Sequence, residues 1–280
     1  ARQREKRLEP GQRPSSNIPW AKLWSVLDWA CSHEVHTVKL LNEHIRQGRL
    51  NEIVTAAEAA YHEDVENAAN LILGRHGEVR LVFIAGPSSS GKTTTTIKLG
   101  EHLAKAGLRL VTLNVDNYFH DLEMHPKDEF GDYDFETPQA LDLPLINQHL
   151  TALLDGQEVQ LPYYDFKTGK RSEKTTPMKL ESNEIILIDS LHGLYPEMTN
   201  SVPEEMKFKL YIEPLLQLKD NEGRYVRWTD IRLMRRMLRD AVHRAYDPTQ
   251  TLLHWHYVRT SELRNIIPYV NTVDAIINSA

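Results

Sequence analysis

The sequence has 280 residues, of which 41% are hydrophobic and 26% charged, a balance typical of a globular protein with its own core. Its net charge of −6 argues against a general nucleic-acid coat, and no apolar run approaches the roughly 18 residues of a membrane span. The single cysteine, Cys31, excludes an internal disulfide and is typical of a reducing compartment, so we expect a cytoplasmic protein. Because Cys31 lies among apolar residues of an expected helix, we expect a buried thiol.

The N-terminal part divides into a linker and a helical segment. Residues 1–19 are basic, contain Pro and Ser and offer little to bury, which predicts a linker. The chain begins at Ala1 with no apolar signal core, from which we expect a fragment of a longer protein. Apolar residues recur at helical spacing over 19–48 and again over 51–73. We therefore expect a helical segment over 20–78, either a preceding module or a brace on the domain after it.

A glycine-rich loop follows the apolar run 81–85 and precedes a helix-compatible stretch. Two glycines, a lysine and a hydroxyl stand at the offsets of a P-loop, whose backbone N–H groups wrap a phosphate. The lysine reaches the β- and γ-phosphates and the hydroxyl ligates Mg²⁺, so ATP and Mg²⁺ are the expected cofactors. The predicted phosphate site comprises Gly86, Ser88, Ser89, Ser90, Gly91, Lys92, Thr93 and Thr94.

Further strands are predicted over 108–115, 184–189, 207–213 and 273–278, with a helix over 138–154. Strands separated by helices indicate an α/β fold, here a P-loop NTPase of the nucleoside/nucleotide kinase type over 79–280, with a five-stranded, mostly parallel sheet. Asp189 ends one strand and is the candidate to hold Mg²⁺ with Thr93, while Asp116 follows another and is the candidate base for a substrate hydroxyl. The alternative for each is a helix N-cap or turn residue.

Residues 229–244 predict a helix with one arginine-rich face. Arg232, Arg235, Arg236, Arg239 and His243 fall in one arc, opposite Leu233, Met234, Met237, Leu238 and Ala241. We expect the apolar face to pack and the guanidinium groups to close over phosphates as a lid. The alternative is a salt-bridged surface helix.

From about Arg80 to Ala280 the chain resembles the uridine kinase/phosphoribulokinase family of P-loop kinases. Six blocks are similar: 86–93, 116–119, 133–138, 161–166, 189–193 and 235–240. The resemblance implies an ATP-dependent kinase for a small-molecule hydroxyl, with Lys92, Asp116, Arg236 and Arg239 as catalytic residues. It implies that Arg239 and Arg244 contact ATP, and that the acceptor pocket contains Tyr118, Phe135, Glu136, Tyr164 and Phe166. Arg171 contacts the acceptor too, or is simply solvated.

Four departures bear on the acceptor. Uridine kinases usually have a histidine where this chain has Gly169, an aspartate at Glu136, Glu-Gly at Asp189-Ser190 and a lid arginine at Tyr246. Kinase chemistry is compatible with these changes. We expect the acceptor to be a nucleoside or a sugar-like molecule. The chain also resembles a bacterial nucleoside kinase-like group in which this domain follows a TGS domain and a threonyl-tRNA-synthetase-like module.

Other functions stay open at this point. An ATP-binding regulatory module that no longer transfers phosphate is the alternative, supported by the absent histidine and lid arginine. A GTPase is less favoured because the guanine-reading pattern is absent, and a nucleic-acid partner is less favoured because the basic residues form one helix. We expect no membrane partner, and the sequence is compatible with a homo-oligomer.

Overall fold

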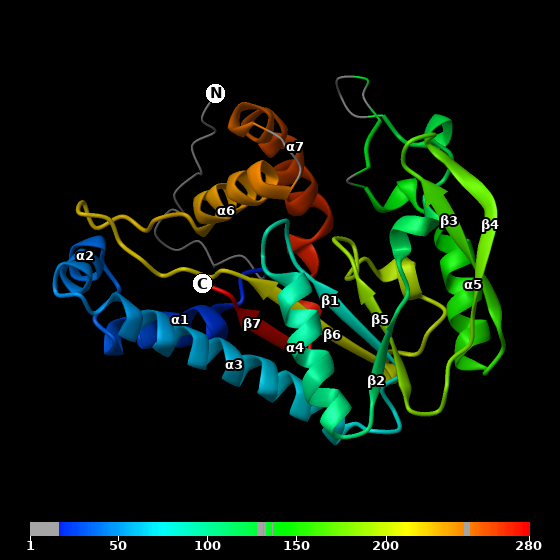
Figure 1. The fold of residues 1–280 in the computed structure, drawn as a ribbon, viewed down its shortest axis with the longest axis horizontal. Coiled ribbons are helices and arrows are strands. Elements are labelled where there is room, and N and C mark those ends of the chain that lie inside the picture. The colour runs from blue at the N-terminus through cyan, green and yellow to red at the C-terminus, as the bar shows by residue number, and fades with distance from the viewer. Residues whose placement is uncertain (1–16, 128–130, 132, 136, 244–246) are drawn as a thin grey trace, which may run out of the picture.

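A five-stranded parallel sheet is the centre of the computed structural model, which describes residues 17–127, 131, 133–135, 137–243 and 247–280 (Figure 1). The strands lie in the order β2-β5-β1-β6-β7, and every neighbouring pair is parallel. Their bounds are β1 Leu81–Ala85, β2 Arg109–Thr112, β5 Glu184–Asp189, β6 Lys207–Glu213 and β7 Ala275–Asn278. The predicted α/β fold is confirmed, with β2 and β7 shorter than expected.

Helices cover both faces of this sheet. On one face α3 (Leu50–Gly74) lies beside α4 (Lys92–Lys105), and their buried side chains share a core with β1, β6 and β7 (Figure 1). On the other face α5 (Leu143–Leu154) packs with the segment after β2. Val65 and Ile72 of α3 are completely buried, so α3 packs directly on the sheet and shares its core.

A second sheet consists of the antiparallel strands β3 (Val159–Asp165) and β4 (Lys170–Met178). The sequence analysis did not anticipate this hairpin. The expected helix 138–154 is divided into a short turn, η3 (Pro138–Ala140), and α5, since the side chain of Asp142 accepts a hydrogen bond from Leu145 N and caps α5.

The remaining helices lie at the two ends of the chain. They are α1 (Trp20–Ser32), α2 (Val38–Arg46), α6 (Trp228–His243) and α7 (Pro248–Asn265). Short turns connect other elements along the chain: η1 (Val115–Tyr118), η2 (Leu122–Met124), η4 (Pro196–Thr199), η5 (Glu204–Met206) and η6 (Ile267–Thr272). Cys31 of α1 is exposed, so the expectation of a buried thiol is wrong. Among the described residues, no helix is long and apolar enough to span a bilayer.

Candidate active site

The loop between β1 and α4 has the geometry of a phosphate cradle. Gly86 is so close to β6 that a Cβ there would overlap the carbonyl oxygen of Ile212, and Gly91 has a φ of +100°, which side chains rarely adopt. The ammonium of Lys92 folds back to donate to Gly86 O at 2.9 Å. Both glycines are therefore required for the loop to curl into the first turn of α4, where free N–H groups attract anions.

The threonines of the first turn of α4 point in different directions. Thr93 and Thr94 are exposed, which leaves their hydroxyls accessible to a ligand at the loop. Thr95 is buried, and its hydroxyl contacts Gly91 O at 3.1 Å and the hydroxyl of Tyr61 at 2.8 Å. Through Tyr61, the helix α3 thus supports the first turn of α4.

Two carboxylates lie on the same edge of the sheet as the P-loop. Asp189 ends β5, beside Ile84 of β1, and Asp116 lies on η1, just after β2, the neighbour of β5 on its other side. Burial raises the pKa of Asp189, Lys92 opposes that rise, and the charge of Asp116 adds to it. Asp116 reaches solvent, yet the protein around it displaces enough water to raise its pKa, again opposed by Lys92. The structure thus brings Lys92, Asp116 and Asp189 together.

These groups fit a divalent cation bound with phosphates. Two partly desolvated carboxylates share Lys92 as a neighbouring cation, and raised carboxyl pKa values indicate that more positive charge would be favourable there. Within the described residues, no set of three or more His, Cys, Asp or Glu side chains forms a metal cage. Mg²⁺ does not need such a cage, because it usually keeps several waters and takes phosphate oxygens as ligands.

A buried histidine that the sequence analysis did not single out lies near Lys92. His192 is 4% exposed, and neither of its ring nitrogens has a hydrogen-bond partner in the described structure. Burial, with a smaller contribution from Lys92, lowers the pKa of His192 to about 4. His192 is therefore neutral at physiological pH and adds no positive charge to the site.

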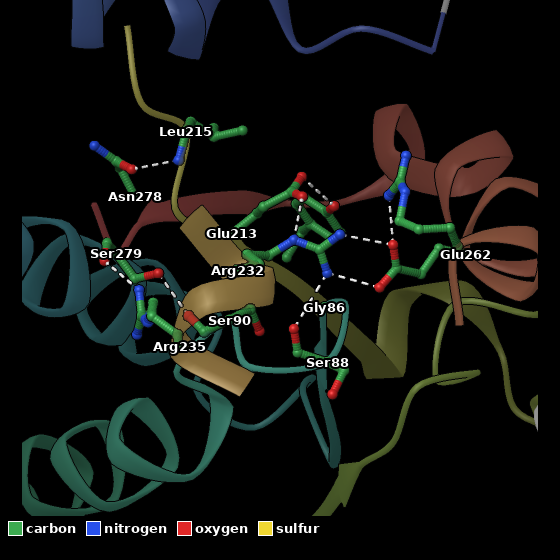
Figure 2. Close-up of polar contacts among 12 residues, drawn as sticks. Gly86, Ser88, Ser90, Glu213, Leu215, Arg232, Arg235, Glu262, Asn278 and Ser279 are labelled. Atoms are coloured by element: carbon green, nitrogen blue, oxygen red, sulfur yellow. Dashed lines mark hydrogen bonds and ion pairs between the residues drawn. The ribbon is translucent and has the colours of Figure 1, made fainter. Parts of the chain in front are cut away.

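The arginines of α6 face the P-loop, as Figure 2 shows for Arg232 and Arg235. Arg232 is completely buried, and its guanidinium pairs with Glu262 of α7 and with Glu213 of β6. It also donates to Ser88 O at 3.2 Å. The guanidinium of Arg232 is thus committed to buried carboxylates, which differs both from the expected lid arginine and from the alternative of a salt-bridged surface helix.

The next arginine along the helix fastens the loop to the end of the chain. Arg235 donates to Ser279 O at 3.0 Å, and the hydroxyl of Ser279 donates to Ser90 O at 2.5 Å (Figure 2). The residues after β7 thereby support the P-loop as well.

Arg236 and Arg239 share a buried carboxylate of α6, and Arg236 also contacts the P-loop. Arg236 donates to the hydroxyl of Ser88 at 3.0 Å, and Arg236 and Arg239 both contact the buried carboxylate of Asp240, at 3.3 and 2.9 Å. Asp240 therefore orients both guanidinium groups, and Arg236 already touches the P-loop.

The prediction that the apolar face of α6 packs against the protein is wrong. Met234 and Leu238 are 53% and 69% exposed, while Arg232, on the arginine face, is completely buried. The reason is the position of the partners of Arg232, since Glu213, Glu262 and the carbonyl oxygen of Ser88 all contact its guanidinium.

An aromatic cluster follows η1 and lies beside the hairpin. Phe119 is the centre of the cluster, with ring centroids 5.6 Å from Phe135, 5.5 Å from Tyr164, 6.0 Å from Phe166 and 5.3 Å from His125. Tyr164 is buried, whereas Phe135 and Phe166 are partly exposed. Three residues of the expected acceptor pocket are thus adjacent, and His125 is a member that the sequence analysis missed because its family blocks did not include the segment 120–132.

Two expected acceptor residues are used by the fold. Tyr118 is completely buried with its hydroxyl 2.9 Å from His149 Nδ1. The guanidinium of Arg171 donates to Tyr118 O, Phe119 O and the carboxylate of Asp142 at 2.8–3.0 Å. The Arg171 side chain is only partly exposed and its guanidinium binds these internal groups, so we remove both residues from the acceptor set. Glu136, Arg244, Tyr246 and the side chain of His243 lie outside the described residues.

Comparison with known proteins gives one consistent result. Residues 81–280 match the model of the "Phosphoribulokinase / Uridine kinase family". The uridine kinase of Deinococcus deserti is 30% identical over 204 residues, which are 72% of this chain and 89% of that protein. Uridine-cytidine kinase B of Dictyostelium discoideum is 26% identical over 198 residues, 70% of this chain and 73% of that protein. A solved structure described as a possible uridine kinase from Bacillus stearothermophilus has the same fold, with a TM-score of 0.51 and 16% identity over 77% of this chain and 98% of that one.

Proposed function

The chain belongs to the phosphoribulokinase / uridine kinase family, and we propose that it transfers the γ-phosphate of ATP to a hydroxyl of a nucleoside or sugar-like molecule. The observation that supports this most is electrostatic: Lys92 acts on both Asp116 and Asp189 at the carboxyl edge of the sheet. A lysine at the phosphates, a carboxylate for Mg²⁺ and a carboxylate for the hydroxyl proton are what phosphoryl transfer to an alcohol requires.

In the proposed mechanism the P-loop amides and Lys92 bind the β- and γ-phosphates. Asp116 takes the proton of the acceptor hydroxyl as its oxygen bonds to the γ-phosphorus, and the bond from that phosphorus to the β,γ-bridging oxygen breaks to release ADP. Thr93 and Asp189 are the residues that would hold Mg²⁺, which when bound neutralises charge on the phosphate oxygens. Arg236 and Arg239, oriented by Asp240, stabilise the charge on the transferring group.

We propose a kinase domain over 79–280, with the helical segment 20–78 as its brace, and this is supported by the core that α3 shares with the sheet. The TGS and threonyl-tRNA-synthetase-like module before it rests only on the resemblance of residues 40–73.

The test is ADP release from MgATP by the purified chain against nucleosides, pentoses, sugar phosphates, glycerate and inositol. We expect at least one acceptor to stimulate release, and Asp116→Asn to abolish that stimulation while ATP binding is retained. Asp155→Asn is the matched control, because Asp155 is an exposed carboxylate at the end of α5. Tight ATP binding without acceptor-dependent release across the panel would overturn the kinase proposal in favour of an ATP-binding regulatory module.

A further inference from the structure

Two side chains of α3 reach residues that contact the P-loop. Tyr61 and Asp64 are three positions apart, which places them on the same face of the helix, and both are partly buried. They belong to the helical segment before residue 81, where the match to the kinase family begins. Their contacts thus connect a segment outside the matched residues to the phosphate cradle.

The first contact runs from Tyr61 to Gly91. The hydroxyl of Thr95, on a completely buried side chain, donates to Gly91 O at 3.1 Å. Since that donation uses its single hydrogen, the Tyr61 hydroxyl, 2.8 Å away, must be the donor to Thr95 Oγ1. Burial raises the pKa of Tyr61, which keeps its phenol protonated and able to donate. Tyr61 therefore holds the Thr95 hydroxyl on the carbonyl of Gly91.

The second contact runs from Asp64 to Ser90. The carboxylate of Asp64 accepts from Asn278 N at 2.9 Å, and the ammonium of Lys22 on α1 contacts its two oxygens at 2.5 and 2.6 Å. The residue after Asn278 is Ser279, whose hydroxyl donates to Ser90 O at 2.5 Å (Figure 2). Asp64 therefore fixes the backbone from which Ser279 reaches the P-loop.

The two carbonyls that receive these contacts belong to consecutive peptide groups. A peptide group is planar, and in its trans form the C=O and the N–H point in opposite directions. Holding Ser90 O and Gly91 O thus fixes the directions of the N–H groups of Gly91 and Lys92. Backbone N–H groups of a P-loop are the groups that bind the phosphates.

We propose that Tyr61 and Asp64 are positioning residues for ATP, which hold two consecutive N–H groups of the P-loop toward the phosphates before the nucleotide binds. This inference rests on the nucleotide-binding part of the proposed function and goes beyond it, because it assigns part of that task to α3. A loop already held in its binding conformation loses less entropy when ATP binds, so the affinity rises without a new contact to the ligand.

The first test measures the Kd of MgADP by calorimetry, without an acceptor, in the wild type and Tyr61→Phe. Phenylalanine keeps the ring and removes the hydroxyl, so we expect Kd to rise about 3- to 10-fold, as for the loss of one hydrogen bond. KM for ATP should rise with it, while kcat and KM for the acceptor should change less than about twofold, because neither the acceptor nor the reacting atoms are contacted.

The Thr95 hydroxyl allows a direct check that Tyr61 acts through it. Thr95→Val removes that hydroxyl, so adding Tyr61→Phe to Thr95→Val should raise Kd little further. Thr95→Ser keeps the hydroxyl, and in this background Tyr61→Phe should again have its full effect. A role of the Tyr61 ring in packing alone would give the same effect in both backgrounds.

The second contact is tested by Asp64→Ala, which should raise the Kd of MgADP by a similar factor. Lys22→Met is the control for the lost ion pair, because it leaves a carboxylate that still accepts from Asn278 N. Arg75→Met is the control for a general loosening of α3, since Arg75 follows that helix and binds Asp274 and two nearby backbone carbonyls. Both controls should change Kd less than about twofold.

The outcomes separate this inference from the proposed function. An unchanged Kd in Tyr61→Phe or in Asp64→Ala would overturn the role of that residue, and an equal rise in Arg75→Met would overturn both roles. A wild type that binds MgADP but phosphorylates no acceptor would overturn phosphate transfer alone. A wild type that binds no MgADP would overturn the proposed function, and this inference with it.

Discussion

The guanidinium of Arg232 and the carboxylate of Glu262 are joined by two hydrogen bonds of 2.6 Å each, and both side chains are buried. Glu213 adds a third contact at 3.1 Å, so one cation compensates two buried carboxylates. Because Glu262 lies on α7, Glu213 on β6 and Ser88 in the P-loop, Arg232 on α6 connects four parts of the site. This cluster holds α6 against the phosphate loop.

Replacing Arg232 by methionine should destabilise the fold strongly. Methionine keeps much of the volume but leaves Glu213 and Glu262 buried without their cation, and breaking a buried pair from one side costs about 3–5 kcal/mol. Urea unfolding measures the change. Arg224→Met is the control, because that guanidinium pairs with Asp220 at the surface, where such pairs contribute at most about 1 kcal/mol. Similar decreases in the free energy of unfolding in the two variants would contradict a structural role for the Arg232 cluster.

The raised pKa of Asp116 should appear in the acid limb of kcat/KM. A protonated carboxyl cannot take a proton, so activity should rise with pH through a pKa above the value of about 3.9 of an ordinary aspartate. The measurement is kcat/KM for the best acceptor across the acidic range. Asp116→Asn should abolish this limb together with most of the activity, whereas Asp155→Asn should retain it. A limb at the ordinary aspartate value would show that Asp116 is not the base.

His192 should make stability depend on pH. Its folded pKa of about 4 lies below the unfolded value of 6.5, so the unfolded chain binds more protons between these values. Stability is therefore present above pH 6.5 and is lost as the pH falls towards 4. We expect about 2 kcal/mol of this loss by pH 5.

The check for His192 is the free energy of unfolding at pH 7 and pH 5 in wild type and His192→Gln. Glutamine does not titrate, so the fall between the two pH values should be about 2 kcal/mol smaller in the variant. The difference between the two proteins cancels the contribution of the other histidines. An equal fall in both would mean that His192 is not held neutral by burial.

The elements that could be predicted from the sequence are those that depend on residues close together in the chain. The strands at 81–85, 184–189 and 207–213 have the expected bounds because each contains a run of buried apolar residues, and the P-loop spacing located the phosphate cradle. The strand at Lys170–Met178 was missed because it is mostly polar and gains its order from pairing with β3. The orientation of α6 depends on Glu213 and Glu262, which lie 19 residues before and 30 residues after Arg232. The helical spacing of residues 229–244 alone therefore could not reveal that orientation.

Gly169→Ala should weaken both the fold and the acceptor site. An alanine there adopts an unfavourable positive φ and places its Cβ 3.0 Å from Leu122 Cβ, so η2 must shift. Gly156→Ala is a matched control, because its φ of +75° imposes a similar backbone cost while no atom lies within 4 Å of the added Cβ. We expect the free energy of unfolding to fall by about 1 kcal/mol in Gly156→Ala and by about 1–2 kcal/mol more in Gly169→Ala.

The effect of Gly169→Ala on the kinase should be confined to the acceptor. A shift of η2 moves His125, the residue directly after it, away from the aromatic rings, whereas no backbone hydrogen bond joins the P-loop to this turn in the described structure. KM for the acceptor should therefore rise several-fold while KM for ATP stays constant, and Gly156→Ala should change neither. Equal unfolding losses in the two variants, with an unchanged acceptor KM, would show that Leu122 yields to the methyl group. The position of His125 would then not depend on a bare turn at position 169.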